Sequence, residues 1–488
     1  MLRTGKEHLE RLRDGRVVYI GDERVNDVTS HPAFRNAART VASIYDMKVD
    51  PANAEIMSFI EDDERHSMHF LQARTQEDLR RRTRAHKMIA DMTHGLFGRS
   101  PDHFASSITA MAIDPAVFNV GRRPYADNLV NYYRHVRHND HYVAYAVLPP
   151  QAARDPAFYQ RQNLPVPSLE VIREDDDGVV ISGMKMLATG AIFADEVWIG
   201  NIQPLSPTEA GQAVTCAVPC NANGVALWSR QPLEINAKNE FDSPLSWRFD
   251  ETDSMVMCDN VKIPWERVFV MDDTALSRDV YTRTPGHCYA NHQSNVRFGS
   301  KLRLIVGLAS RVAESTGAAQ VPAVREVLGR LAAFEALLGG MIDGQIEAYE
   351  KWPEGFATYN RRYMYACLNW CIESYSQIID ILRELSGGGV LQMPASITVM
   401  RDPVLARLFE HSWQTPQMPA LDRAKLFKLV WDLVGSEFAG RQLQYEKFYV
   451  GATFTLRAHN YREAPWSDFH RIVDDLLGSY QVNFTNSN

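Results

Sequence analysis

An arginine and a histidine stand four residues apart in the stretch GRSPDH, Gly98 to His103, between two apolar segments. A guanidinium can hold an anion, and an imidazole can form hydrogen bonds or take up a proton near neutral pH. Taken alone, the hexapeptide is more simply a turn between two helices, with a solvated Arg99 and with Asp102 as the cap. The rest of the chain therefore decides whether Arg99 and His103 form a site.

Three histidines, His135, His138 and His141, recur at intervals of three residues in YYRHVRHNDHY. On a continuous helix the outer two lie about 9 Å apart along the axis, which is too far for one small ion. The ExxH pattern of helical di-iron sites is missing, and only Asp63 and His66 approach it. We therefore predict no metal site.

A further polar group lies in HCYANHQSNVR, which contains His287, Cys288, His292 and Arg297 at the start of the last helical segment. Ligand pockets often form where domains meet, which makes His292 a candidate substrate-binding residue. A capping or packing role explains each of these residues equally well when it is taken singly.

Several common site motifs are missing. The chain has no GxGxxG after a strand and no P-loop, so we predict no dinucleotide or triphosphate site of the usual kind. The GxSxG motif is missing as well. Its six cysteines form no CxxC and none precedes Cys216, which indicates neither a disulfide framework nor a zinc knuckle. Cys216 with Cys220, and Cys367 with Cys371, are predicted to pack in the core.

The composition is typical of a globular protein of several domains, with 488 residues and 45% hydrophobic side chains. The net charge of −8 argues against a nucleic acid or an anionic membrane as partner. The first residues do not have the pattern of a signal peptide, and no run of about 18 apolar residues occurs. We therefore expect a cytoplasmic protein without a membrane partner.

The hydrophobic periodicity divides the chain into three predicted domains. Residues 1–140 are mainly helical. They include a short β-ribbon that turns at Gly21 and a long helix capped by Thr75. Residues 141–275 alternate with period two and include a hairpin around 175–178, which favours a β-barrel or sandwich. Residues 276–488 return to amphipathic helices, which predict a bundle whose remaining apolar surface another subunit covers.

The order helical, β, helical, with MVMCDNVKIPWERVFV closing the β segment, resembles the acyl-CoA dehydrogenase fold, an α+β class. Longer motifs restrict the resemblance to one family within this fold. GRSPDH, ISGMKMLATGA, DNVKIPWERV and VWDLVGSEFAGRQLQYEKFYVG are similar to the oxygenase component of 4-hydroxyphenylacetate 3-hydroxylase and to its halophenol-monooxygenase relatives. Motifs of this family follow one another in the family order over nearly the whole chain.

This resemblance implies a two-component monooxygenase. A separate NAD(P)H:flavin reductase would supply reduced FAD (FADH2), and O2 would form a C4a-hydroperoxyflavin that hydroxylates a phenolic substrate, ortho to its hydroxyl. The resemblance also implies a homotetramer. The alternatives are a flavin-dependent acyl-CoA dehydrogenase-like oxidoreductase, which needs a carboxylate base over the flavin, and an inactive oligomeric scaffold of the same fold.

The family motifs also assign residues. Arg99 falls on the substrate arginine and would hold a phenolate, while His103 stands where the family has a tyrosine; these two are the predicted catalytic residues. Ala144, beside Tyr145, stands where the family has a substrate histidine, so the particular phenol stays open. The predicted flavin-binding residues lie in three regions: Ala144, Tyr145, Ala146, Pro150, Gln151 and Arg154; Thr189; and Val450, Gly451, Ala452 and Thr453.

Overall fold

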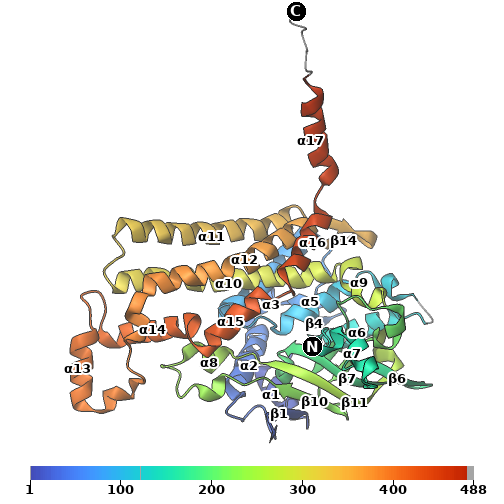
Figure 1. Ribbon diagram of the computed structural model, residues 1–488, viewed down its shortest axis with the longest axis horizontal. Coiled ribbons are helices and arrows are strands. Elements are labelled where there is room, and N and C mark those ends of the chain that lie inside the picture. Colours follow the sequence, from blue (N-terminus) through green and yellow to red (C-terminus); the bar gives the residue numbers. More distant parts are fainter. Residues whose placement is uncertain (1, 121–122, 481–488) are drawn as a thin grey trace, which may run out of the picture.

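The computed structural model describes residues 2–120 and 123–480. Long helices form one layer, strands form another, and the short helix α5 (Pro101–Met111) lies between them (Figure 1). The helix α10 (Gly286–Ser315) contacts α5 on one side and the long helices α11 (Pro322–Glu347) and α12 (Arg361–Ser386) on the other. This arrangement places the GRSPDH segment, which directly precedes and begins α5, in the middle of the molecule.

The first part of the chain contains the helices α1 (Gly5–Arg11), α2 (Arg35–Val49), α3 (Ala54–Met57), α4 (Gln76–Met92) and α6 (Ala126–Asn139), and the strands β1 (Val17–Ile20), β2 (Glu23–Val25), β3 (Ser58–Glu61) and β4 (Glu64–Ser67). The predicted ribbon is confirmed, because β1 and β2 pair antiparallel. The predicted cap is confirmed as well, since the Thr75 hydroxyl accepts from the backbone N–H of Asp78 and the Asp78 carboxylate accepts from that of Thr75.

The middle part contains the strands β5 (Val143–Ala146), β6 (Glu170–Asp175), β7 (Gly178–Thr189), β8 (Glu196–Ile199), β9 (Thr215–Pro219), β10 (Val225–Ser229), β11 (Asp253–Pro264) and β12 (Val268–Val270), with the helices α7 (Pro156–Arg161) and α8 (Pro244–Phe249). The hairpin predicted around 175–178 is confirmed as β6 and β7. The strands form two open sheets, in the orders β2-β1-β10-β11-β7-β6 and β12-β9-β8-β5. Of the two expected arrangements, the closed barrel is therefore wrong.

The last part contains the helices α9 (Leu276–Arg283), α13 (Pro403–Trp413), α14 (Ala420–Val434), α15 (Glu437–Lys447), α16 (Thr453–Glu463) and α17 (Trp466–Gly478), and the short strands β13 (Glu350–Trp352) and β14 (Phe356–Thr358). All six cysteines are buried and unpaired, as the packing prediction requires. Among the helices of the described residues, none combines the length and the apolarity needed to cross a bilayer.

Candidate active site

The helix α5 is buried on every side, from Pro101 to Met111. Pro101 begins the helix, and its ring fixes φ at a helical value. A proline lacks the backbone N–H, but the first N–H groups of a helix form no hydrogen bond within it, so none is lost here. The carboxylate of Asp102 does not cap the helix but contacts Nδ1 of His86 at 2.7 Å. Because the start of α5 lies inside the protein, Arg99 is not a solvated turn residue but a buried cation.

The guanidinium of Arg99 has no carboxylate partner among the described residues, although the residue is only 7% exposed. It donates from Nη2 to the carbonyl of Tyr449 at 2.6 Å and from Nη1 to Nε2 of His103 at 2.8 Å. Its Cζ lies 3.8 Å from the ring centroid of Tyr449. Burial lowers the pKa of Arg99, but the surrounding phenols and the carboxylate of Glu251 outweigh burial and raise it above its usual value. The side chain is therefore a permanent cation.

The imidazole of His103 has a fixed tautomer. A guanidinium has only donors, so Nε2 of His103 must accept the hydrogen bond from Arg99 and the ring proton must lie on Nδ1. Burial, and then the charges of Arg99 and Arg297, hold the pKa of His103 well below its usual value, so the ring is neutral. Its Nδ1 is buried and has no partner within the described residues, which leaves one N–H free to donate.

A buried carboxylate holds the backbone on which Arg99 sits. Oε2 of Glu251 accepts from the backbone N–H groups of Gly98 and Arg99 at 2.8 and 2.9 Å, and Oε1 accepts from Arg441 at 2.8 Å. The hydroxyl of Tyr142 donates to the carbonyl of Arg99. These contacts fix the peptide from both sides, so Glu251 and Tyr142 are positioning residues for the guanidinium.

Gly98 is the one residue type that fits at its position, because a Cβ there would overlap the hydroxyl of Tyr445. That hydroxyl is buried and has no partner among the described residues. The Tyr445 ring lies 5.9 Å from Cζ of Arg99. The Tyr445 hydroxyl and the Nδ1–H of His103 are thus two buried polar groups near Arg99 that lack a partner among the described residues, and such groups could bind a ligand.

The strand β5 brings the predicted positions Ala144, Tyr145 and Ala146 to this cluster. The Tyr145 ring stacks on His103 with centroids 5.7 Å apart and on Phe104 at 4.8 Å. Burial raises the pKa of Tyr145, and Arg99 opposes that shift only in part, so the phenol stays protonated. Tyr145 therefore forms an aromatic wall beside Arg99 and does not act as an anion.

The predicted segment Val450 to Thr453 directly follows Tyr449, whose carbonyl binds Arg99, and it leads into α16. Gly451 has a φ of +93°, which favours glycine, and open space lies where a Cβ would stand. A flat ring could therefore approach the backbone at this turn. The loop and β5 both lie against the Arg99 cluster.

The remaining predicted flavin positions lie along the edge of the sheet. Thr189, at the end of β7, donates its hydroxyl to Asp253 at 2.6 Å, and Asp253 is bound by Arg441, which also holds Glu251. Pro150, Gln151 and Arg154 belong to a short 3-10 turn after β5, at which Gln151 and Arg154 are exposed. Thr189 is connected to the Arg99 cluster through ion pairs, whereas the turn lies on the surface.

His292 is not part of the cluster. Its Nδ1 lies 2.9 Å from Oε1 of Gln345 and its Nε2 lies 2.8 Å from the hydroxyl of Thr83, so both ring nitrogens are used within the helical layer. The ring also stacks on Tyr359 with centroids 3.6 Å apart. Its neighbour Gln293 is the residue that reaches Ser100, at 3.3 Å.

His292 carries a pH prediction. Burial lowers its pKa to about 3, whereas an unfolded histidine has its usual value near 6.5. The unfolded chain therefore takes up this proton first, and His292 lowers the stability as the pH falls below about 6.5. Replacing it as His292→Gln should flatten the slope of unfolding free energy between pH 5.5 and 4 by about 1.4 kcal/mol per pH unit. Urea titrations at several pH values measure this slope, and equal slopes in both proteins would contradict the prediction.

One group of possible metal ligands occurs among the described residues, at His135, His141 and Glu196, whose ligand atoms lie within 4.8 Å of one another. The predicted separation of the two histidines is wrong, because α6 ends at Asn139 and a φ of 50° at Asp140 turns the chain back. Glu196 is already paired with Arg267. Because this cation neutralises the carboxylate, we assign the group as an ion-pair cluster.

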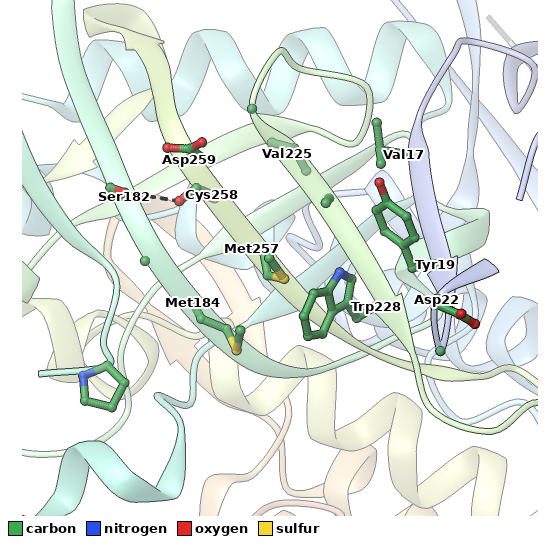
Figure 2. A pocket seen from close by; sticks show the side chains of 15 residues that line it. Val17, Tyr19, Asp22, Ser182, Met184, Val225, Trp228, Met257, Cys258 and Asp259 are labelled. Atoms are coloured by element: carbon green, nitrogen blue, oxygen red, sulfur yellow. Dashed lines mark hydrogen bonds between the residues drawn. The ribbon is translucent and has the colours of Figure 1, made fainter. Parts of the chain in front are cut away.

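A hollow of about 830 Å³ lies elsewhere, on the face of the six-stranded sheet. Tyr19, Met184, Trp228 and Met257 line it together with small residues (Figure 2). Most of its lining is apolar, and none of its residues belongs to the Arg99 cluster. We therefore place the candidate site at Arg99, where buried polar groups lack partners.

Sequence reasoning missed Glu251, Tyr445 and Tyr449 as members of the site. The two tyrosines lie four residues apart in QYEKFYVG, and this spacing places two side chains on the same face of a helix. That spacing was the available signal for the tyrosines. Glu251 lies about 150 residues from Arg99 in sequence, and no local pattern distinguishes it.

Known proteins are similar to this chain over nearly its whole length. A family model described as 4-hydroxyphenylacetate 3-hydroxylase N terminal matches residues 4–270, and one described as the C terminal matches residues 277–478. The chain is 33% identical over 456 residues to the 4-hydroxyphenylacetate 3-monooxygenase oxygenase component of Thermus thermophilus, covering 92% of each protein. It is 32% identical to the 4-nitrophenol 2-monooxygenase oxygenase component of a Rhodococcus species, covering 92% of this chain and 86% of that one.

A solved structure agrees with both matches. The crystal structure of the oxygenase component of 4-hydroxyphenylacetate 3-monooxygenase complexed with FAD and 4-hydroxyphenylacetate superposes with a TM-score of 0.91 at 30% identity, over 98% of each chain. The fold, the length and both family models therefore lead to one conclusion: the chain belongs to the 4-hydroxyphenylacetate 3-hydroxylase family.

Proposed function

We propose that this chain is the oxygenase component of a two-component monooxygenase that adds a hydroxyl group to a phenol, at the carbon ortho to the phenolic oxygen. It uses reduced FAD and O2. A separate NAD(P)H:flavin reductase supplies the reduced flavin. The printed names of the relatives support this activity, because they are oxygenase components that act on 4-hydroxyphenylacetate or 4-nitrophenol.

The observation that carries the proposal is the unpaired buried cation at Arg99. A buried charge without a counter-charge is costly, so such a site favours an anionic ligand. A phenolate oxygen provides this charge on an otherwise flat and apolar molecule. The Nδ1–H of His103 and the hydroxyl of Tyr445 are buried beside Arg99 and can donate to the same region. The aromatic wall of Tyr145 offers a surface for the ring.

Arg99 would also direct the chemistry. Holding the substrate as a phenolate raises the electron density at the ring carbon ortho to the oxygen, which is the carbon that must attack an electrophilic oxygen. The polar side of the substrate is fixed by the Arg99 guanidinium, while burial of α5 excludes water. The protein therefore acts by orientation and by electrostatics.

The flavin fits the strip formed by β5, Thr189 and the loop Val450 to Thr453. Gly451 allows close approach of a flat ring, and the backbone of β5 offers hydrogen-bonding groups beside Tyr145. When bound there, reduced FAD together with O2 supplies the electrophilic oxygen. Thr189 would contribute its backbone, since its hydroxyl is donated to Asp253.

The acyl-CoA dehydrogenase alternative receives no support from the site. That chemistry needs a carboxylate free to take a proton above the flavin. The buried carboxylate beside Arg99 is Glu251, and its two oxygens are occupied by backbone N–H groups and by Arg441.

We also propose that the chain is cytoplasmic and that it forms a homotetramer. The assembly is supported by the apolar surface that remains uncovered on the helical layer.

A panel of phenols tests the function. Purified chain, enzymatically regenerated reduced FAD and O2 are mixed with phenols that differ in their para substituents, and products are scored by mass. We expect a gain of one oxygen with at least one phenol and no product from the matched anisoles, whose oxygen cannot ionise. Product formation from anisoles and phenols alike would contradict a phenolate site, and no product from any phenol would contradict the activity.

A variant at His103 tests its role as a donor. His103→Phe removes the Nδ1–H and the acceptor of Arg99 while keeping a flat ring against Tyr145. We expect the KM for the phenol to rise about tenfold, as for the loss of one hydrogen bond to a charged group. Because burial holds the pKa of His103 well below its usual value, the dependence of kcat on pH between 6 and 8 should keep its shape. Loss of a kinetic pKa in this range would instead identify His103 as a base.

A further inference from the structure

The helix α10 carries a completely buried lysine, Lys301. Its side chain is 0% exposed, and its Nζ donates to Oε1 of Gln442 at 2.7 Å and to Oε1 of Glu446. Burial lowers the pKa of Lys301 to about 8, although the carboxylate of Glu446 opposes this shift. Lys301 therefore loses its charge about two pH units earlier than an ordinary lysine.

Glu446, on α15, is shared by two cations. Arg297 donates from Nη1 to Oε1 at 2.6 Å and from Nη2 to Oε2 at 2.8 Å, and Lys301 donates to Oε1 as well. Burial raises the pKa of Glu446, but the two cations outweigh burial and lower it to about 2. The pKa of Arg297 is raised above its usual value, so this side chain stays charged. The three groups, which we call the buried triad, thus carry one positive charge while Lys301 is protonated and none afterwards.

The ring of Tyr449 is in contact with both the triad and Arg99. Its centroid lies 4.7 Å from Cζ of Arg297 and 3.8 Å from Cζ of Arg99. The hydroxyl of Tyr449 donates to the carbonyl of Gly98 at 2.9 Å and accepts from the hydroxyl of Ser294 at 3.1 Å. The ring is therefore held in place, and the two guanidinium groups are closer together than the sum of the two distances.

The charge of the triad is therefore felt at the candidate site. After burial and the charge of Arg99, the charge of Arg297 is the next cause of the low pKa of His103. At an effective dielectric constant of about 20, a unit charge about 10 Å away changes a pKa by about one unit. A positive triad thus stabilises an anion at Arg99, and by linkage an anion bound there raises the pKa of Lys301 by the same amount.

Other ionisable groups lie around Lys301. The ring of Tyr375, on α12, has its centroid 5.4 Å from Nζ, and burial raises its pKa, so this phenol keeps its proton. The charge of Glu251, ahead of β11, raises the pKa of Lys301. On α4, which also packs against α10, Asp91 is paired with Lys87. Because the other two members of the triad keep their charges, the net charge of the triad changes with Lys301 alone.

We propose that the charge of Lys301, acting through the triad and the ring of Tyr449, sets the affinity of the Arg99 site for phenolates. The inference rests on the proposed function, since it takes the ligand at Arg99 to be an ionised phenol. Lys301 acts through other residues, so it is a specificity-determining residue and not a catalytic one. The site binds phenolates best above the pH at which the phenol ionises and below the pH at which Lys301 loses its proton.

The affinity of the purified chain for 4-nitrophenol tests the proposal. The phenolate of this compound absorbs visible light, so free and bound ligand can be measured by equilibrium dialysis. Between about pH 7.5 and about pH 9.5 the free phenol is itself largely ionised, so a change in affinity reports on the protein. We expect the Kd of the parent to rise about tenfold over this range, because a pKa shift of about one unit corresponds to a tenfold change in affinity.

Three variants identify the group that titrates. Lys301→Met removes the charge, and we expect its Kd to be about tenfold above that of the parent at the lower pH, with no further rise. Lys301→Arg keeps a charge throughout, so its Kd should stay low at every pH, which a merely structural role would not produce. Lys185→Met is the control, because burial lowers the pKa of Lys185 to about 8 as well, but its Nζ donates to Oδ1 of Asn201 at 2.7 Å. It should keep the rise of the parent.

A parent Kd that does not rise, a rise that persists in Lys301→Met or Lys301→Arg, or a rise that is lost in Lys185→Met would overturn the proposal. If circular dichroism shows that Lys301→Met does not fold, Lys301→Arg decides alone. Absence of any phenolate binding by the parent would overturn the phenolate site itself, and with it the proposed function. Binding that does not depend on pH would overturn the role of Lys301 only.

Discussion

Arg99→Ala is expected to reduce hydroxylated product by about 10² to 10³-fold per reduced flavin consumed, while H2O2 rises to account for the missing oxygen. The substitution removes the cation that holds the phenolate, together with the bonds to His103 and to the carbonyl of Tyr449. Reduced flavin should still react with O2, because the predicted flavin strip lies on β5 and on the loop after Tyr449. Product mass and a peroxidase-coupled assay measure both quantities in one reaction.

The matched control is Arg99→Lys. Lysine keeps the charge but replaces the planar fork by a single ammonium group, so it cannot donate to Tyr449 and His103 with the same geometry. We expect its coupling to fall between those of the parent and the alanine variant. Fully coupled hydroxylation in Arg99→Ala would show that the substrate is held elsewhere.

Glu251→Ala is expected to cause the largest loss of stability among the site variants. It leaves Arg441 with Asp253 alone and leaves two buried backbone N–H groups, of Gly98 and Arg99, without an acceptor. Removing one partner of a buried ion pair costs about 3–5 kcal/mol. Urea unfolding followed by circular dichroism should show a shift of this size.

Asp176→Asn is the control for Glu251→Ala, since Asp176 is an exposed carboxylate in the turn between β6 and β7. It should change the unfolding free energy by less than about 0.5 kcal/mol. A Glu251→Ala effect below about 1 kcal/mol would mean that the carboxylate does not hold the Gly98 to Arg99 peptide. Glu251→Gln, which keeps the size, separates stability from positioning, because it should lower coupling through a displaced Arg99 while the chain stays folded.

The local elements of the fold were predictable because their signals lie within a few residues. The ribbon β1 and β2, the hairpin β6 and β7 and the cap at Thr75 each depend on turn residues or on a side chain three residues away. The parallel pairing of β1 with β10 joins residues about 200 positions apart, and sequence alternation says nothing about such partners. The two open sheets therefore could not be distinguished from a barrel.

The candidate site was predictable only in part. Arg99 and His103 lie in one hexapeptide, which the family motif singles out. Glu251 and Tyr449 reach the same place through contacts across the fold, and Tyr449 acts through its carbonyl, which every residue has. The approach of His135 to His141 depends on one residue with positive φ, at Asp140, and a continuous-helix model excludes it.

The fixed tautomer of His103 has a consequence for the substrate's proton. Arg99 can only donate, Nε2 of His103 is occupied and the ring resists protonation, so none of these groups can accept a proton from a neutral phenol. On the proposed function, neither Arg99 nor His103 would take the proton of the phenol, which would then leave to solvent before the substrate is enclosed. Acidic phenols, such as those with nitro or halogen substituents, enter already ionised at neutral pH. On the proposed function, the site would favour acidic phenols as substrates.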